Sequence, residues 1–179
     1  MKHEAIVDQP VIEAARFLLR PLRPSDEGLI ELNASDPRVA MNTSSIPHPL
    51  PPGTTEALIA RAMADDRSED IWAMDGSAEG GSEVMGVISL TRMERAQSEI
   101  GFWVAPAYWN TGVASTALEA LLSANPQHAR TIFAAVFQDN AASARVVTNC
   151  GFAYIGDAET FSVARNARVP TWTYIRKID

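Results

Sequence analysis

The chain has 179 residues, 46% of them hydrophobic and 21% charged, as expected of a soluble globular protein with one domain and a real core. Its net charge of -7 argues against general affinity for nucleic acid or anionic membranes. Cys150 is the only cysteine, which excludes an intrachain disulfide and indicates a reducing compartment.

The N-terminal stretch gives no targeting signal. Met1–Glu4 lacks an apolar core of the signal-peptide type, and no apolar run approaches the roughly 20 residues of a membrane span. We therefore expect a cytoplasmic protein. Residues 1–10 show weak patterning and predict a poorly ordered lead-in, followed by a single domain over residues 11–179.

The next part of the chain predicts a strand, a helix and a long loop. Phe17–Leu19 is a short apolar run that ends at an Arg-Pro pair, which indicates a first strand. Ser25 is placed to cap a helix whose apolar face holds Leu29 and Leu32. Asp36–Gly53 is rich in Pro, Ser, Thr and Asn, which predicts a long loop with a helical turn, and such loops are often functional.

A second helix and three strands follow. Thr54 or Thr55 can cap the helix, and its apolar side holds Leu58, Ile59, Ala62 and Met63. Three apolar runs predict the strands: Ile71–Met74, Val84–Leu90 and Glu99–Ala105. The last two are joined by a short polar link, so we expect an antiparallel hairpin.

The last third alternates helices and strands. A helix is expected from about Gly112 to Asn125, then a buried strand over Ile132–Phe137, then a helix that begins after Asn140 and ends before Gly151. Two final strands and the polar loop between them complete the chain: Phe152–Ile155, Gly156–Pro170 and Thr171–Ile175. The order predicts one α/β domain with a mixed sheet and parallel pairing around the first of these helices.

Two short stretches suggest chemistry. The turn at Gly112 precedes a helix whose first N–H groups have no intrahelical partner, and small Ala114 and Ser115 leave room there, which predicts an anion site suited to phosphate. A plain tight turn is the alternative. Asn140 and Ser143 share one side of a first helical turn, where Asn140 can also be no more than an N-cap.

Together these stretches resemble the GCN5-related N-acetyltransferase (GNAT) superfamily. Its pyrophosphate loop, Gln/Arg-x-x-Gly-x-Gly/Ala, is matched by the segment Trp109–Ala114, with Trp109 in place of the polar first residue. Its later pattern, Asn-x-x-Ser-x-Arg and then Gly-Phe, is matched by Asn140, Ser143, Arg145, Gly151 and Phe152. Further segments resemble the branch that acetylates ribosomal-protein N-termini (RimJ/RimL-like): Arg16–Leu22, Glu99–Val104 and Tyr108-Trp109.

The resemblance implies a single-domain α+β fold with about four helices and a mostly antiparallel sheet of about seven strands, splayed open at its centre. Acetyl-CoA would lie in that opening as co-substrate. Its pyrophosphate would bind the amides of Asn110, Thr111, Gly112, Val113 and Ala114. Its pantetheine arm would pair with Trp103, Val104 and Ala105, and Asn140 and Ser143 would face the sulfur.

The implied reaction is direct attack of a primary amine on the thioester. Glu99 is the candidate base, with a structural carboxylate as the alternative, and Ser143 is the candidate donor to the leaving sulfur. The acceptor, a peptide N-terminus or a small molecule, would bind between the loops 36–53 and 157–170. The histidines show no metal-ligand spacing, so no metal is expected.

Other features of the sequence stay open or ordinary. Arg165 and Arg168 are expected on a solvated loop face, or in contact with an acidic substrate tail or the CoA 3′-phosphate, and Cys150 is expected as a packing residue. We expect no nucleic-acid or membrane partner, and a homodimer is left open. The alternative function is a non-catalytic acyl-CoA binding or sensing module on the same fold.

Overall fold

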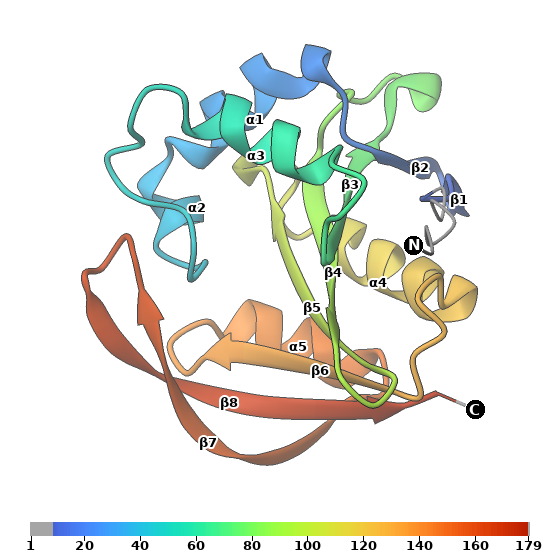
Figure 1. The fold of residues 1–179 in the computed structure, drawn as a ribbon, viewed down its shortest axis with the longest axis vertical. Coiled ribbons are helices and arrows are strands. Elements are labelled where there is room, and N and C mark those ends of the chain that lie inside the picture. Colours follow the sequence, from blue (N-terminus) through green and yellow to red (C-terminus); the bar gives the residue numbers. More distant parts are fainter. Residues whose placement is uncertain (1–8, 179) are drawn as a thin grey trace, which may run out of the picture.

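Eight strands form one sheet in the computed structural model, which describes residues 9–178 (Figure 1). The strand order is β1-β2-β3-β4-β5-β6-β8-β7. The strands are β1 (Ile12–Ala14), β2 (Phe17–Pro21), β3 (Glu69–Asp75), β4 (Gly86–Met93), β5 (Gln97–Val104), β6 (Thr131–Phe137), β7 (Ala153–Ser162) and β8 (Ala167–Lys177).

Five α-helices accompany the sheet within the described residues: α1 (Glu27–Ala34), α2 (Pro37–Ala40), α3 (Thr54–Ala62), α4 (Val113–Ala124) and α5 (Ala141–Asn149). Three short 3-10 turns complete them: η1 (Pro24–Asp26), η2 (Ser77–Glu79) and η3 (Pro106–Tyr108). The predicted α/β fold with a mixed, mostly antiparallel sheet is confirmed, with one strand and one helix more than the approximate counts. The predicted lead-in, residues 1–10, lies almost wholly outside the described residues.

The pairing of β5 with β6 is the one parallel contact of this sheet over residues 9–178, and it is incomplete. It runs from Gln97 opposite Thr131 to Ile100 opposite Ala134, and the remaining halves of both strands diverge. The hairpin of β4 and β5 is antiparallel throughout, as predicted. The sheet is therefore splayed open between β5 and β6.

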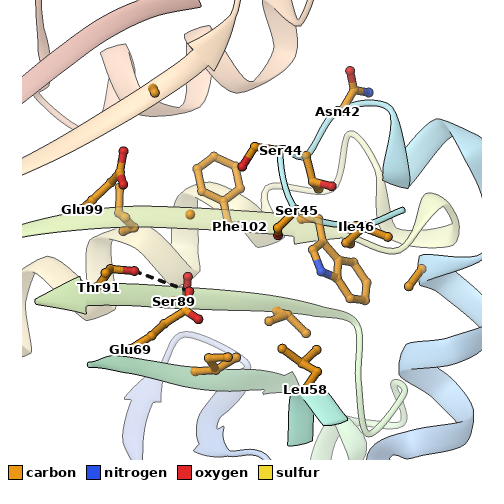
Figure 2. Close-up of a pocket in the computed structure, with 18 of the residues that line it drawn as sticks. Asn42, Ser44, Ser45, Ile46, Leu58, Glu69, Ser89, Thr91, Glu99 and Phe102 are labelled. Atoms are coloured by element: carbon orange, nitrogen blue, oxygen red, sulfur yellow. Dashed lines mark hydrogen bonds between the residues drawn. The ribbon is translucent and has the colours of Figure 1, made fainter. Parts of the chain in front are cut away.

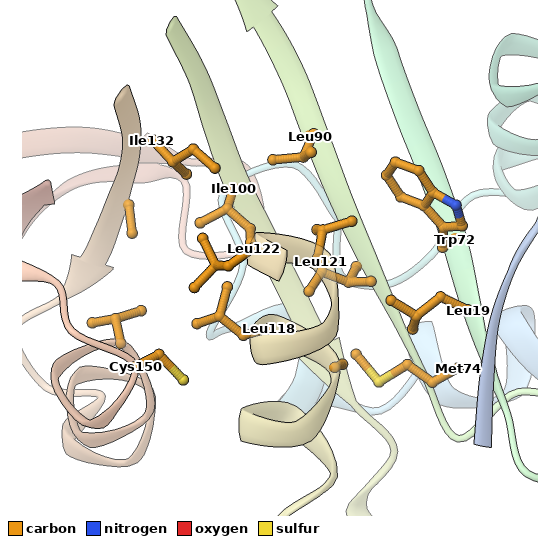
Figure 3. Close-up of a cluster of buried hydrophobic side chains, with 14 of the residues drawn as sticks. Leu19, Trp72, Met74, Leu90, Ile100, Leu118, Leu121, Leu122, Ile132 and Cys150 are labelled. Carbon is orange, nitrogen blue, oxygen red and sulfur yellow. The ribbon is translucent and has the colours of Figure 1, made fainter. Parts of the chain in front are cut away.

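The two faces of the sheet bury different helices. Leu118 and Leu121 of α4 pack against Leu90 and Ile100 on one face (Figure 3), as the apolar spacing of that helix predicts. On the opposite face, α1 and α3 cover alternate strand residues and contribute a second cluster that includes Ile59. Each fully buried side chain of this size contributes roughly 1.5–3 kcal/mol.

A buried ion network joins β2 to β3 and to the turn η1, which precedes α1. The first helix begins later than predicted. The Arg20 guanidinium donates to Asp75 at 2.6 Å and to both oxygens of Asp26 at 2.8 and 2.9 Å. Burial alone would raise the pKa of Asp75, but hydrogen bonds from Ser77 and Arg20 outweigh it and hold that pKa below its usual range. Ser25 lies in the 3-10 turn η1 and is not the N-cap of α1.

Several expected boundaries and faces were wrong. In α1, Ile30 is buried and Leu32 is exposed, and Met63 is exposed at the end of α3. The short strand β1 was not predicted, because three residues carry no readable alternation. The loop expected over 156–170 is instead most of a long hairpin, β7 and β8. Since β7 is an edge strand and mostly exposed, its sequence lacks the apolar alternation that marks a half-buried strand.

Candidate functional site

The start of α4 is an open turn. Gly112 has a left-handed φ of 81°, and a Cβ at this position would meet no atom within 4 Å. Gly112 is the N-cap residue, and Asn110 and Thr111 beside it are also exposed. Since the first N–H groups of a helix lack intrahelical partners, this end offers donors and positive potential at an uncovered surface. The geometry suits the predicted anion site.

The diverging edge of β5 lies beside this turn. The Ala105 N–H donates to the Met85 carbonyl at 2.8 Å, on the β4 side. Backbone groups of neighbouring strand residues point to opposite edges, so the Val104 N–H faces the edge that β6 has left. The Val104 carbonyl already accepts a hydrogen bond from the Trp109 indole at 2.7 Å. No pattern in the sequence indicated that contact.

Asn140 and Ser143 come together at the start of α5, on the other side of the opening. The side-chain oxygen Oδ1 of Asn140 accepts the Ser143 N–H at 3.3 Å, which confirms Asn140 as the N-cap. Its amide nitrogen donates to Ser143 Oγ at 3.0 Å. Because Oγ accepts this bond, the hydroxyl hydrogen of Ser143 is free to be donated to a ligand.

A cavity of about 470 Å³ extends from the open part of β5 to the start of α5, and Figure 2 shows many of its lining residues. The predicted CoA residues Val104, Ala105 and Asn110–Ala114 are not among the residues that line it. Its floor is the sheet face that carries Glu99, Gly101 and Trp103, and its far end reaches Asn140 and Ser143. The segment between α2 and α3 and residue Thr160 of β7 supply walls, so both loops predicted to frame an acceptor contribute lining residues. The predicted catalytic pair thus lines one cavity.

Glu99 shares the cavity with a second carboxylate, Glu69 of β3 (Figure 2). The Glu99 side chain is exposed to the cavity, yet desolvation by the surrounding protein and the negative charge of Glu69 raise its pKa. A carboxyl group shifted in this direction is better matched to accepting a proton near neutral pH. The sequence did not indicate Glu69 as a site residue, because Glu69 precedes the apolar run that marks β3.

Arg165 lies at the tip of the β7–β8 hairpin and binds the segment after α2 and the loop before α5. Its guanidinium binds both oxygens of Asp139 at 2.6 and 3.0 Å and donates to the Met41 carbonyl at 2.8 Å. It also lies over the Phe137 ring, 4.9 Å from the ring centre. The expectation of a solvated loop face was therefore wrong for Arg165, while Arg168 is exposed.

The remaining singled-out residues have ordinary surroundings. Cys150 is buried, its Sγ lies 3.8 Å from the Ser115 carbonyl, and burial raises the pKa of its thiol, as for a packing residue. Among residues 9–178, no group of three His, Cys, Asp or Glu side chains is arranged to hold a metal ion. Over the same residues, every helix is too short or too polar to span a membrane.

Comparisons with known proteins give one family and many similar folds. The family model of the acetyltransferase (GNAT) domain matches residues 16–153. A search of curated proteins found no match. The acetyltransferase (GNAT family) structure from Bacillus anthracis is 20% identical, with a TM-score of 0.77 over 94% of this chain and 98% of that chain.

Two further structures are similar to the chain. The ribosomal L7/L12 alpha-N-protein acetyltransferase RimL, in complex with coenzyme A, is 18% identical, with a TM-score of 0.79 over 95% of this chain and 99% of that chain. The spermidine N-acetyltransferase from Vibrio cholerae, in complex with CoA and spermine, is 16% identical, with a TM-score of 0.76 over 92% and 96%. At these identities the likeness establishes the fold.

Proposed function

Because the chain belongs to the GNAT acetyltransferase family, we propose that it transfers an acetyl group from acetyl-CoA to a primary amine of a peptide N-terminus or a small molecule. The predicted superfamily and acyltransferase class are confirmed by the family match, and the fold is similar to that of RimL. The observation that carries the proposal is one cavity in which Glu99, Ser143 and the open edge of β5 meet. We assign the reaction to a catalytic domain over residues 11–179.

The residues present fit acetyl-CoA. The amides of Asn110, Thr111, Gly112, Val113 and Ala114 would hold its pyrophosphate, because they surround the uncovered start of α4. The edge of β5 at Trp103, Val104 and Ala105 would hold its pantetheine arm by strand-like pairing. Pairing at the Val104 carbonyl requires the Trp109 indole to yield its hydrogen bond. When bound, acetyl-CoA supplies a thioester carbonyl for attack and a thiolate leaving group.

Three groups of this chain would act on the reacting atoms. Glu99, with its raised pKa, takes a proton from the acceptor ammonium, directly or through water, so that the neutral amine can attack. The Val104 N–H donates to the carbonyl oxygen as negative charge develops there. Ser143 donates its free hydroxyl hydrogen to the departing sulfur, and Asn140 keeps that hydroxyl oriented.

The acceptor screen is the direct test. Purified protein is mixed with acetyl-CoA and a panel of peptides, amino acids, polyamines and aminoglycosides, and free thiol and acetylated products are measured by mass spectrometry. We expect stoichiometric thiol and N-acetyl product with at least one acceptor. CoA binding without turnover across the panel would contradict catalysis and favour the binding or sensing module.

Glu99→Gln tests the assigned base. We expect turnover to fall about 100-fold with CoA affinity unchanged. Because the base acts in its ionised form, kcat/KM of the wild type should rise with pH through a pKa above the ordinary glutamate value. That rise should be absent in the variant. Glu79→Gln, an exposed carboxylate in η2, is the control and should behave like the wild type. An identical pH profile in Glu99→Gln would remove Glu99 from the mechanism.

A further inference from the structure

We propose that Glu69 is a positioning and specificity-determining residue, which holds an acceptor that enters as an ammonium ion and acts on the proton transfer through Glu99. This inference rests on the proposed function and deepens it. It assigns the acceptor to alkyl ammonium compounds, including peptide N-termini, in preference to amines that are neutral at pH 7.

The register of the sheet places the two carboxylates on one row. Glu69 of β3 is opposite Thr91 of β4, and Thr91 is opposite Glu99 of β5. Residues directly opposite each other in neighbouring strands project from the same face. All three line the cavity, and Figure 2 shows them on adjacent strands, with the 3.5 Å hydrogen bond from Thr91 Oγ1 to Glu69 drawn as a dashed line.

The charges of the cavity lining favour a cation at this row. Within residues 9–178 the lining carries three charged side chains, Glu69 and Glu99 on the floor and Arg61 at the end of α3. Along the row, Thr91 lies between the two carboxylates and Phe133 of β6 lies opposite Glu99. An ammonium ion beside the row meets two carboxylates, whereas a neutral amine gains little there.

A separate observation concerns a polar group in the wall of the cavity. Thr171 of β8 lines it, is 1% exposed, and its hydroxyl has no hydrogen-bond partner in the part of the chain that the structure describes. A buried hydroxyl without a partner costs free energy that a ligand or water can recover. The cavity thus offers an acidic row on its floor and an unused hydroxyl in its wall.

Two carboxylates on one row give Glu69 two effects on the reaction. Its charge attracts the acceptor ammonium and therefore lowers KM. The same charge disfavours ionisation of Glu99, which keeps Glu99 a strong enough base to remove a proton from that ammonium. The proton passes from the acceptor nitrogen to a Glu99 oxygen, and Glu69 takes no part in this transfer.

The first experiment needs no acceptor. The carboxyl group of Glu99 is titrated by carbon NMR in the full chain, with its signal assigned by comparison with Glu99→Gln. We expect Glu69→Gln to lower the pKa of Glu99, Glu69→Asp to retain most of the raised value, and Glu79→Gln to leave it unchanged. An unchanged Glu99 pKa in Glu69→Gln would overturn the inference even if no acceptor turns over.

The second experiment separates binding from chemistry with matched acceptors. We expect Glu69→Gln to raise KM for an alkyl ammonium acceptor, such as the best amine of the screen, about 5-fold, since a partly exposed charge contact is worth about that factor. KM for a neutral amine, such as an aromatic analogue of the same size, should not change. Equal effects on both acceptors would contradict the assignment of Glu69 to ammonium recognition, while leaving the acetyl transfer itself intact.

Discussion

At the scale of single residues, backbone conformation decides what the start of α4 can bind. Gly112 adopts a left-handed conformation and leaves the space above it empty. Any other residue would put a Cβ into that space and would be strained by roughly 1–2 kcal/mol. The absence of a side chain is therefore both a conformational requirement and a condition for a ligand to approach the helix amides.

Gly112→Glu is expected to weaken CoA binding about 100-fold, because a carboxylate would stand where the pyrophosphate is proposed to bind. The measurement is calorimetric titration with CoA. Gly80→Glu is a matched control, since Gly80 has the same φ of 81° and equally empty surroundings but lies in the turn after β3. Both variants should lose similar stability. Equal CoA affinity in the two variants would refute the pyrophosphate placement.

Residues whose function is local were predictable, and residues brought together by the sheet were not. Gly112 and Asn140 were found because helix starts have short-range signals in the sequence. Glu69 and Arg165 bind partners 22 and 26 residues away, through strand register and a hairpin tip. One sequence contains no record of register, so neither of these contacts could be predicted in advance.

At the scale of elements, the side chain of Asn140 has two functions in the first turn of α5. The Asn140 oxygen caps the helix and its amide nitrogen orients the Ser143 hydroxyl. Aspartate can perform the first task but not the second, because a carboxylate only accepts hydrogen bonds. The two tasks can therefore be separated by one substitution.

Asn140→Asp should retain or slightly raise stability, since a carboxylate at a helix start is favourable by roughly 0.3–1 kcal/mol. Turnover should fall about 10-fold, because the Ser143 hydroxyl would turn to donate to the introduced carboxylate in place of the leaving sulfur. Thermal unfolding and steady-state rates are measured side by side. Asn140→Ala is the comparison and should lose about 1 kcal/mol as well as turnover. Full activity in Asn140→Asp would exclude the orienting role.

Elements with strong periodicity were predicted well. Apolar spacing predicted α4, β6 and the β4–β5 hairpin, because each of these elements buries apolar side chains on one or both of its faces. The extent of β7 did not follow, since this edge strand is exposed on most of its length and has a polar sequence like that of a loop. Burial, and with it the readable pattern, depends on the neighbours that the finished sheet provides.

At the scale of the whole molecule, the cavity is closed by segments that are far apart in the chain. Arg165 joins the β7–β8 hairpin to the segment after α2 and to the loop before α5. A backbone hydrogen bond of 3.0 Å from Val163 to the Ser44 carbonyl adds to the same contact. The guanidinium of Arg165 holds the pKa of Asp139 below its usual range, which keeps this pair charged. The last hairpin thus helps to assemble the side of the cavity where we propose that the acceptor binds.

Arg165→Ala should raise KM for the acceptor about 5-fold and leave CoA affinity unchanged, because the side chain orders cavity walls away from the start of α4. Stability should fall by about 1 kcal/mol or less, since Asp139 is largely exposed. Arg168→Ala, an exposed arginine on the same hairpin, is the control. A matching rise in KM for Arg168→Ala would show that general charge, and not this contact, is responsible.

The hydrogen bond between the Trp109 indole and the Val104 carbonyl gives the molecule a built-in optical reporter. A ligand that pairs with the edge of β5 must displace the indole from a peptide carbonyl, and the side chain is already 39% exposed. Its fluorescence should therefore change as the opening between β5 and β6 fills. Trp72 is fully buried, whereas Trp103 lies on the cavity floor, so the Trp109 signal is isolated as the difference between the wild type and Trp109→Phe. Occupancy of the cleft can thus be followed without a label.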